Sequence, residues 1–146
     1  MDVIRRDTDY ALRLMVNLAK NSSREAVSSR TLAEEEEVSY QLTCKLLQKL
    51  NSGGLVRSKM GPKGGFFIGK TPSKITLGYV VKVIQGPISL NRCLFETGVC
   101  FRQPNCPIRK KLAELQEYIE RFLKNVTIEQ ILKTQKLEKE KKYGVK

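Results

Sequence analysis

Apolar residues recur every three or four positions between Thr8 and about Asn21, a spacing that predicts an amphipathic helix. Asp7 or Thr8 is placed to cap the start of this helix. Further along, Ser29 can cap a second, shorter helix that runs through the glutamates at 34–37. The glutamate run is most simply the solvated face of that helix, and we assign it no chemistry.

A longer helix is expected from Tyr40 to about Ser52, because leucines again recur at helical spacing and two glycines follow. Two short β-prone runs, 55–59 and 65–70, then flank a turn rich in glycine and proline. Two helices joined by a short turn and followed by a hairpin predict a winged helix-turn-helix. An ordinary exposed hairpin is the alternative, and the position of this hairpin directly behind the two helices favours the DNA-binding interpretation.

The helix at 40–52 has an apolar side and a polar side. The apolar side, expected to face the core, consists of Leu42, Leu46, Leu47 and Leu50. The opposite side, expected to face the major groove, consists of Gln41, Cys44, Lys45 and Gln48. We interpret Cys44 as a small residue tolerated at the edge of the core. With the helix start and the wing added, the predicted DNA contacts are Ser39, Gln41, Lys45, Gln48, Lys59 and Lys63.

The second half of the chain carries two further helical patterns. Thr76 can cap the first of these helices, which Gly86 and Pro87 end, and Pro107 suits the first position of the next. Apolar residues in that later helix are spaced by four, three, four and three residues, at Ile108, Leu112, Leu115, Ile119 and Phe122. This seam predicts a symmetric homodimer, the alternative being that it packs on the chain's own core. A capping-box spacing at 127–130 predicts a final short helix.

Charge and composition narrow the class of protein. The formal net charge of +12 over 146 residues favours polyanionic partners, and it would attract nucleic acid and an anionic membrane surface equally. The helix-turn-helix pattern, and not the charge, makes double-stranded DNA the expected partner. The sequence shows neither a signal peptide nor a membrane-spanning apolar run, so we expect a cytoplasmic protein. There is no histidine to act as a general base and no glycine motif that would hold a phosphate before a helix, so we expect no enzyme.

Three of the four cysteines, Cys93, Cys100 and Cys106, lie close together in a stretch broken by glycine and proline. Thiolates favour zinc, copper(I) or iron–sulfur clusters, and the absence of histidine means that imidazole cannot complete the set. The alternatives are unligated thiols, or a disulfide with one cysteine left over. Because a reducing compartment disfavours structural disulfides, a metal or cluster is the preferred interpretation.

These patterns divide the chain into four segments. Residues 1–86 are predicted to form a winged helix-turn-helix DNA-binding domain, and 87–107 a cysteine loop that binds the metal centre. Residues 108–132 are predicted to form the dimerisation helix and a terminal helix, and 133–146 a basic, disordered tail. The expected fold class is therefore mostly α with a small β-hairpin.

Several motifs resemble those of the Rrf-two type bacterial transcriptional regulators, a family that includes IscR-type and NsrR-type iron–sulfur proteins. The resemblance covers roughly residues 3 to 132. Its marks are residues 8–13, 55–58, 61–66 and 122–127, together with Arg92 and the three clustered cysteines. The resemblance implies a dimeric winged-helix protein whose cysteine loop holds an iron–sulfur cluster near the partner's DNA-binding domain, and whose DNA binding depends on that cluster.

The resemblance also implies a ligand set, with one departure. IscR-type members place a histidine ligand at the position of Arg109, and an arginine cannot ligate a metal. NsrR-type members use an aspartate in the partner's first helix, which matches Asp9 here, with Asp7 as the second choice. The implied ligands are therefore Cys93, Cys100, Cys106 and Asp9, a set that favours a 4Fe-4S cluster over a 2Fe-2S cluster. Asp9 would equally stabilise a helix N-terminus, and the two roles are compatible.

The resulting hypothesis is an iron–sulfur-dependent transcriptional repressor that senses iron, redox state, nitric oxide or cluster status. Two alternatives stay open: a constitutive winged-helix protein with a structural zinc, and a small iron–sulfur carrier. The wing arginine of IscR-type members is replaced by Met60, so their base preference does not transfer to this chain.

Overall fold

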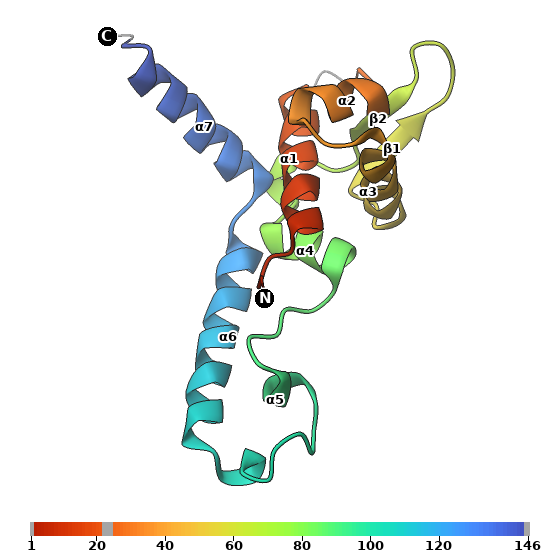
Figure 1. Cartoon of the computed structure of the whole chain (residues 1–146). Helices are drawn as coiled ribbons and strands as arrows, with labels where there is room; N and C mark the ends of the chain where they lie inside the picture. Colours follow the sequence, from red (N-terminus) through yellow and green to blue (C-terminus); the bar gives the residue numbers. More distant parts are fainter. Residues whose placement is uncertain (1, 22–24, 145–146) are drawn as a thin grey trace.

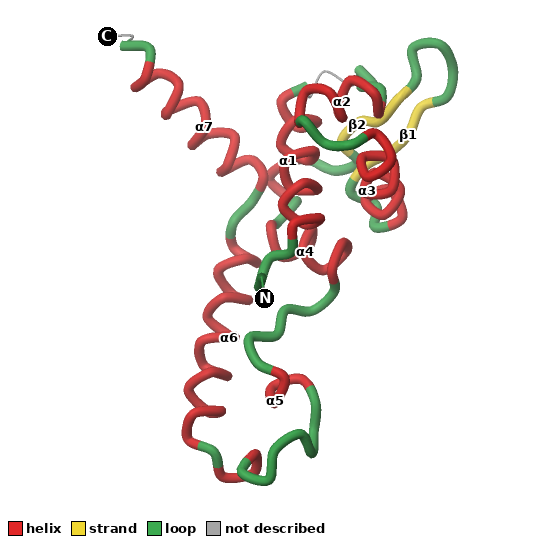
Figure 2. Tube along the Cα trace, viewed as in Figure 1, coloured by secondary structure: helices red, strands yellow, loops and turns green. Residues whose placement is uncertain are grey.

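The protein is an elongated, mostly helical molecule in which a small winged domain lies beside a long pair of C-terminal helices (Figure 1). The computed structural model describes residues 2–21 and 25–144. Within this part of the chain, the strands form one antiparallel hairpin, as Figure 2 shows. The predicted fold class is confirmed. The ends of the first and last predicted segments, residues 1 and 145–146, lie outside the described residues.

Helix α1 (Arg6–Lys20) is central to the winged domain and packs against α2, α3, α4, α7 and β2. It begins earlier than predicted, with Arg5 as its N-cap residue and no side-chain cap. Thr8, one of the two predicted caps, is fully buried and donates its hydroxyl to Oε1 of Gln85 at 2.7 Å. The prediction of Asp7 or Thr8 as cap was therefore wrong, because the helix begins at Arg6 and both residues lie inside its first turn.

Helices α2 (Ser29–Glu36) and α3 (Tyr40–Ser52) form the helix-turn-helix. The cap of α2 is Ser28, whose side chain accepts a backbone N–H at 3.1 Å, and not the predicted Ser29. Helix α3 has the predicted bounds, and the side chain of Ser39 caps it by accepting a backbone N–H at 3.3 Å. The winged helix-turn-helix pattern thus forms where the sequence indicated it.

The glutamate run does more than face solvent. Asn17 of α1 is 6% exposed, and its amide donates to Glu35 Oε2 and Glu36 Oε1 at 2.8 Å each. Arg13 of α1 also pairs with Glu36, with 3.4 Å between Nε and Oε2. The interpretation of this run as a merely solvated face was incomplete, because two of its residues hold α2 against α1.

The wing consists of β1 (Val56–Lys59) and β2 (Gly65–Ile68), paired so that Ser58 lies opposite Phe66. Phe66 also exchanges two backbone hydrogen bonds of 2.8 Å with Val27, in the segment before α2. Gly65 has a φ of +152°, and a Cβ at this position would collide with the backbone of Val27. A glycine is therefore required where the wing base meets the segment before α2.

Helix α4 (Leu77–Gln85) follows a short 3-10 turn, η1 (Pro72–Lys74), and connects the winged domain to the cysteine loop. As predicted, Thr76 caps α4 through its side chain and Gly86 ends it with a φ of +83°. The Gln85 side chain holds the start of the chain in place: its Oε1 also accepts the N–H of Arg5 at 2.9 Å, and its Nε2 donates to the carbonyl oxygen of Val3 at 2.9 Å.

The cysteine loop contains two short elements that the sequence did not predict, α5 (Arg92–Phe95) and η2 (Gln103–Asn105). Helix α6 (Pro107–Asn125) follows, with proline at its first position as expected. A capping box formed by Thr127 and Gln130 starts the last helix, α7.

Helix α7 (Ile128–Lys142) corrects the prediction of a disordered tail from residue 133. The composition of this segment is that of a disordered chain, but its glutamates and lysines also suit a solvated helix. Glu129 and Lys133, four residues apart, pair at 3.5 Å. Ile128 is fully buried and the first turns of α7 pack on α1, so the helix is anchored at its start and projects outward from there (Figure 1).

The core lies mainly in the winged domain, where α1, α2, α3 and α4 meet β1, and Ile128 of α7 adds to it. Its largest fully buried side chains include Leu14, Met15, Leu18, Leu32, Leu46, Leu47, Leu50 and Leu55. Helix α6 contributes no buried residue to it. Among the helices of the described residues, none is both long and apolar enough to cross a membrane.

Candidate nucleic-acid interface and metal centre

The outer side of α3 presents the polar residues that the sequence predicted for it. Gln41, Lys45 and Gln48 are exposed, whereas Leu46 and Leu47 on the inner side are fully buried. Leu42, also on the inner side, is only half-buried, and it packs against the core from the edge. Cys44 is half-buried between the two sides, consistent with its interpretation as a residue at the edge of the core.

The C-terminal end of α3 adds a residue that the sequence analysis did not single out. Lys49 is exposed and donates from Nζ to the carbonyl oxygen of Ile84, the penultimate residue of α4, at 3.5 Å. It lines a shallow groove on the surface of α3 together with Lys45 and Gln48. Helical phase alone could have placed Lys49 beside Lys45, but its contact with α4 depends on the tertiary fold.

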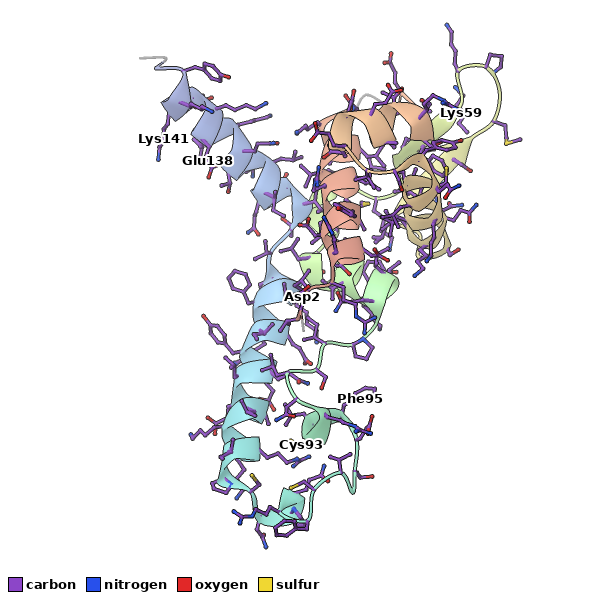
Figure 3. All side chains as sticks on the ribbon, viewed as in Figure 1. Asp2, Lys59, Cys93, Phe95, Glu138 and Lys141 are labelled. Atoms are coloured by element: carbon purple, nitrogen blue, oxygen red, sulfur yellow. The ribbon has the colours of Figure 1, made fainter. Side chains whose placement is uncertain are left out.

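The wing carries two exposed lysines beside the helix-turn-helix. Lys59 ends β1, and Lys63 lies in the turn that follows. Met60, which comes directly after Lys59 in the sequence, is 92% exposed. Figure 3 shows Lys59 at the wing, on the same side of the molecule as α3. Lys59 and Lys63 line a groove between the wing and α2 that also includes Glu35. The wing therefore presents positive charge beside α2, the first helix of the helix-turn-helix.

The three clustered cysteines lie at the other end of the molecule, in the loop between α4 and α6 (Figure 3). Cys93 belongs to α5 and is half-buried, and Cys100 is exposed in the following loop. Cys106 is the N-cap residue of α6, and its sulfur accepts the N–H of Arg109 at 3.5 Å. The partial positive charge of a helix N-terminus would help to offset the negative charge of a bound metal–thiolate centre.

Gln103 organises the backbone of this loop, a role that no sequence pattern indicated. Its Nε2 donates to the carbonyl oxygens of Cys93 at 2.7 Å and Glu96 at 2.6 Å, and its Oε1 accepts the N–H of Gly98 at 2.8 Å. Arg109, at the position where IscR-type members have a histidine, donates from Nε to the same Cys93 carbonyl at 3.0 Å. One side chain from η2 and one from the first turn of α6 thus hold the segment that carries Cys93.

The donor set fits a thiophilic metal or an iron–sulfur cluster in kind, because it offers three sulfur atoms and no competing imidazole. The described residues of the single chain do not gather three metal-binding side chains into one group. Asp9 is exposed in the first turn of α1, within the winged domain, and Asp7 beside it is half-buried. The structure therefore does not bring the predicted ligands Cys93, Cys100, Cys106 and Asp9 together within one subunit.

Comparison with known proteins assigns the chain to a family. Residues 4–134 match the Rrf2 family, described as iron-dependent transcriptional regulators. The chain belongs to the Rrf2 family. It is 29% identical over 128 residues to the HTH-type transcriptional regulator IscR of Klebsiella pneumoniae, a match that covers 88% of this chain and 78% of that protein.

Solved structures of Rrf2 regulators have the same fold. CymR, the global cysteine regulator of B. subtilis, superimposes with a TM-score of 0.77 at 25% identity, covering 92% of this chain and 98% of that one. T. potens IscR superimposes with a TM-score of 0.71 at 23% identity, covering 90% and 86% of the two chains. The relatives are DNA-binding transcriptional regulators and not enzymes, which confirms both the resemblance and the non-enzymatic class predicted from the sequence.

Proposed function

We propose that this Rrf2 protein is an iron–sulfur-dependent transcriptional repressor that binds an operator as a homodimer. The observation that carries the proposal is the combination, in one Rrf2 chain, of a polar outer face on α3, a lysine-bearing wing and a loop with three cysteines. The net charge of +12 supplies the attraction for the DNA backbone.

The proposed DNA contacts divide by position on the helix-turn-helix. Gln41, Lys45 and Gln48 extend from the exposed side of α3 and would reach base edges or phosphates in the major groove. Ser39, whose oxygen already accepts a backbone N–H, keeps its own hydroxyl hydrogen for a phosphate. The two wing lysines, Lys59 and Lys63, would neutralise phosphates of the adjoining backbone.

The proposed cluster ligands are the three loop cysteines and Asp9 of the partner subunit. A bound cluster would supply an iron atom that is sensitive to redox state, nitric oxide and iron supply. Cys106 is already placed at the N-terminus of α6, and Gln103 and Arg109 hold the backbone of Cys93. Asp9 projects from the first turn of α1, so its ligation would connect the loop of one subunit to the winged domain of the other.

The proposed dimer is supported by the seam on α6. Ile108, Leu115 and Phe122 are 68%, 48% and 56% exposed, whereas Leu112 and Ile119 are half-buried, so the single chain buries only part of the seam. Such a surface is most economically covered by a second copy of the same helix.

Anaerobic purification tests the cluster. We expect a brown protein that contains iron and sulfide, and loss of both in Cys93→Ala, Cys100→Ala and Cys106→Ala, because each variant removes one of three strong ligands. Cys44→Ala is the matched control, since Cys44 lies on α3 away from the loop, and it should keep the colour. A colourless wild-type protein that contains zinc would identify a constitutive DNA-binding protein instead.

Operator binding tests the switch. Holo and apo protein should differ in affinity for the operator more than for unrelated DNA, because removal of the cluster leaves the basic charge of α3 and the wing unchanged. Fluorescence anisotropy at several salt concentrations measures both affinities. Equal operator affinity of the two forms at every salt concentration would rule out cluster-dependent regulation while leaving DNA binding intact.

A further inference from the structure

Arg30 and Tyr40 form a pair on the surface of the helix-turn-helix. Arg30 lies in the first turn of α2, and Tyr40 is the first residue of α3. The guanidinium carbon of Arg30 is 5.0 Å from the centroid of the Tyr40 ring. Both side chains are exposed, Tyr40 to 47%. Neither residue belongs to the DNA contacts that the sequence predicted.

The position of Tyr40 is one from which a helix-turn-helix reads DNA. The N-terminal residues of a recognition helix contact base edges, while the preceding helix crosses the phosphate backbone. Tyr40 stands between the cap residue Ser39 and the proposed contact Gln41. Its ring edge offers an apolar surface for a thymine methyl group, and its hydroxyl can donate to a phosphate oxygen.

Packing does not account for the exposure of this ring. Tyr10 and Tyr79 pack against the core cluster, but Tyr40 is absent from that cluster and from the residues around it. Arg30 forms no ion pair with an acidic residue anywhere in the described part of the chain, so the Tyr40 ring is the contact that orients its guanidinium. A guanidinium fixed over a ring keeps its N–H groups available and loses less freedom when it binds a phosphate.

We propose that Arg30 and Tyr40 act as one additional DNA-reading unit, in which Tyr40 contacts a thymine-bearing base pair at the start of α3 and Arg30 binds the adjacent phosphate. The proposal rests on the DNA-binding function of the chain but is independent of the iron–sulfur cluster. It adds a base preference that the outer side of α3, with Gln41, Lys45 and Gln48, does not account for.

The experiment selects DNA from a pool of random duplexes with the full-length wild-type protein and with Tyr40→Ala, and sequences the enriched pools. Binding of the enriched duplex and of a scrambled duplex is then measured by anisotropy over a series of salt concentrations. Tyr143→Ala is the matched control for the ring, because Tyr143 is 75% exposed at the end of α7. Lys136→Ala, also on α7, is the matched control for removal of one positive charge.

Tyr40→Ala is expected to lose a thymine preference at one position of each half-site and to bind the enriched duplex about tenfold more weakly, with little change on the scrambled duplex. Tyr40→Phe should keep the preference, because the ring edge remains. Arg30→Ala should weaken binding to both duplexes and reduce the salt slope by about one per bound subunit. Arg30→Lys should restore the slope, because an ammonium also neutralises the phosphate.

Circular dichroism first checks that Tyr40→Ala is folded. The proposal would be overturned if the folded variant enriched the same sequence as the wild type and Tyr143→Ala, with the same ratio of affinities for the enriched and scrambled duplexes. Should Tyr40→Ala fail to fold, Arg30→Ala decides: a salt slope equal to that of Lys136→Ala and the wild type overturns the phosphate contact. A wild-type protein that enriches no sequence would contradict the proposed operator binding itself, which is a different outcome.

Discussion

Gln85, at the last position of α4, is a single side chain that joins the start of the chain to the winged domain. It accepts from Arg5 and from the buried hydroxyl of Thr8, and it donates to Val3. A buried hydroxyl that loses its partner is costly, because no water replaces the bond. Gln85 therefore fixes the first turn of α1, which carries Asp9.

Gln85→Ala is expected to lower the free energy of unfolding by about 1–3 kcal/mol, mainly because Thr8 is left unpaired. In a Thr8→Val background the same substitution should cost less, since the buried hydroxyl is then absent. Urea unfolding of the four proteins measures this coupling, and Lys82→Ala, an exposed residue of the same helix, serves as control. Additive costs of the two substitutions would contradict the proposed partnership.

Gln103→Ala should loosen the cysteine loop without unfolding the winged domain, because its three hydrogen bonds all lie within residues 93–103. We expect faster hydrogen exchange at Gly98, whose N–H the side chain now accepts, and faster loss of iron from the holo protein. Asn105→Ala is the control in the same loop, since no hydrogen bond of its side chain is found among the described residues. Unchanged exchange at Gly98 would show that the backbone holds its own shape.

At the scale of single residues, the sequence predicted which side of a helix a residue occupies better than it predicted hydrogen-bond partners. The thiols and the exposed polar residues of α3 follow from spacing, because a short period fixes which side of a helix each residue occupies. The partners of Thr8, Gln103 and Arg109 lie up to 77 residues away, and a lone glutamine in a loop carries no periodic signal. Whether Asp9 completes the ligand set stays a prediction.

At the scale of elements, the bounds of α3 and α4 were predicted correctly because each has a side-chain cap and a glycine stop. The bounds of α7 were not, since lysine and glutamate are common both in disordered tails and in solvated helices. The capping box and the burial of Ile128 stabilise the helical state of this segment. A short signal at 127–130 thus determined the state of the following residues more than their composition did.

Thr127→Ala is expected to reduce the stability of α7 by about 1 kcal/mol, because it removes the N-cap hydroxyl and one half of the capping box. Far-UV circular dichroism should show loss of helix, and thermal unfolding of the winged core should shift little. Thr134→Ala, within the same helix and bonded only to the carbonyl of Gln130, is the matched control. Equal loss of helix in both variants would argue against a special role for the cap.

At the scale of the whole molecule, the exposed apolar seam on α6 is the feature that calls for a second copy. Phe122→Glu should convert the proposed dimer to a monomer, because a carboxylate in the buried interface would lack a partner. The fold of the monomer should survive, since Phe122 is 56% exposed in the single chain. Sedimentation equilibrium measures the change, and Lys110→Glu on an exposed position of the same helix is the control. A dimer that persists in Phe122→Glu would place the interface elsewhere.

The outward projection of α7 affects which measurement can determine the oligomeric state. The helix extends away from the winged domain while the cysteine loop extends in the opposite direction, so the chain is far from spherical (Figure 1). An elongated particle experiences more friction than a sphere of the same mass and elutes early from a size-exclusion column calibrated with compact proteins. A monomer of 16.6 kDa will therefore resemble a larger species by elution volume. Sedimentation equilibrium and light scattering report mass without assuming a shape, so they can distinguish one chain from two where elution volume cannot.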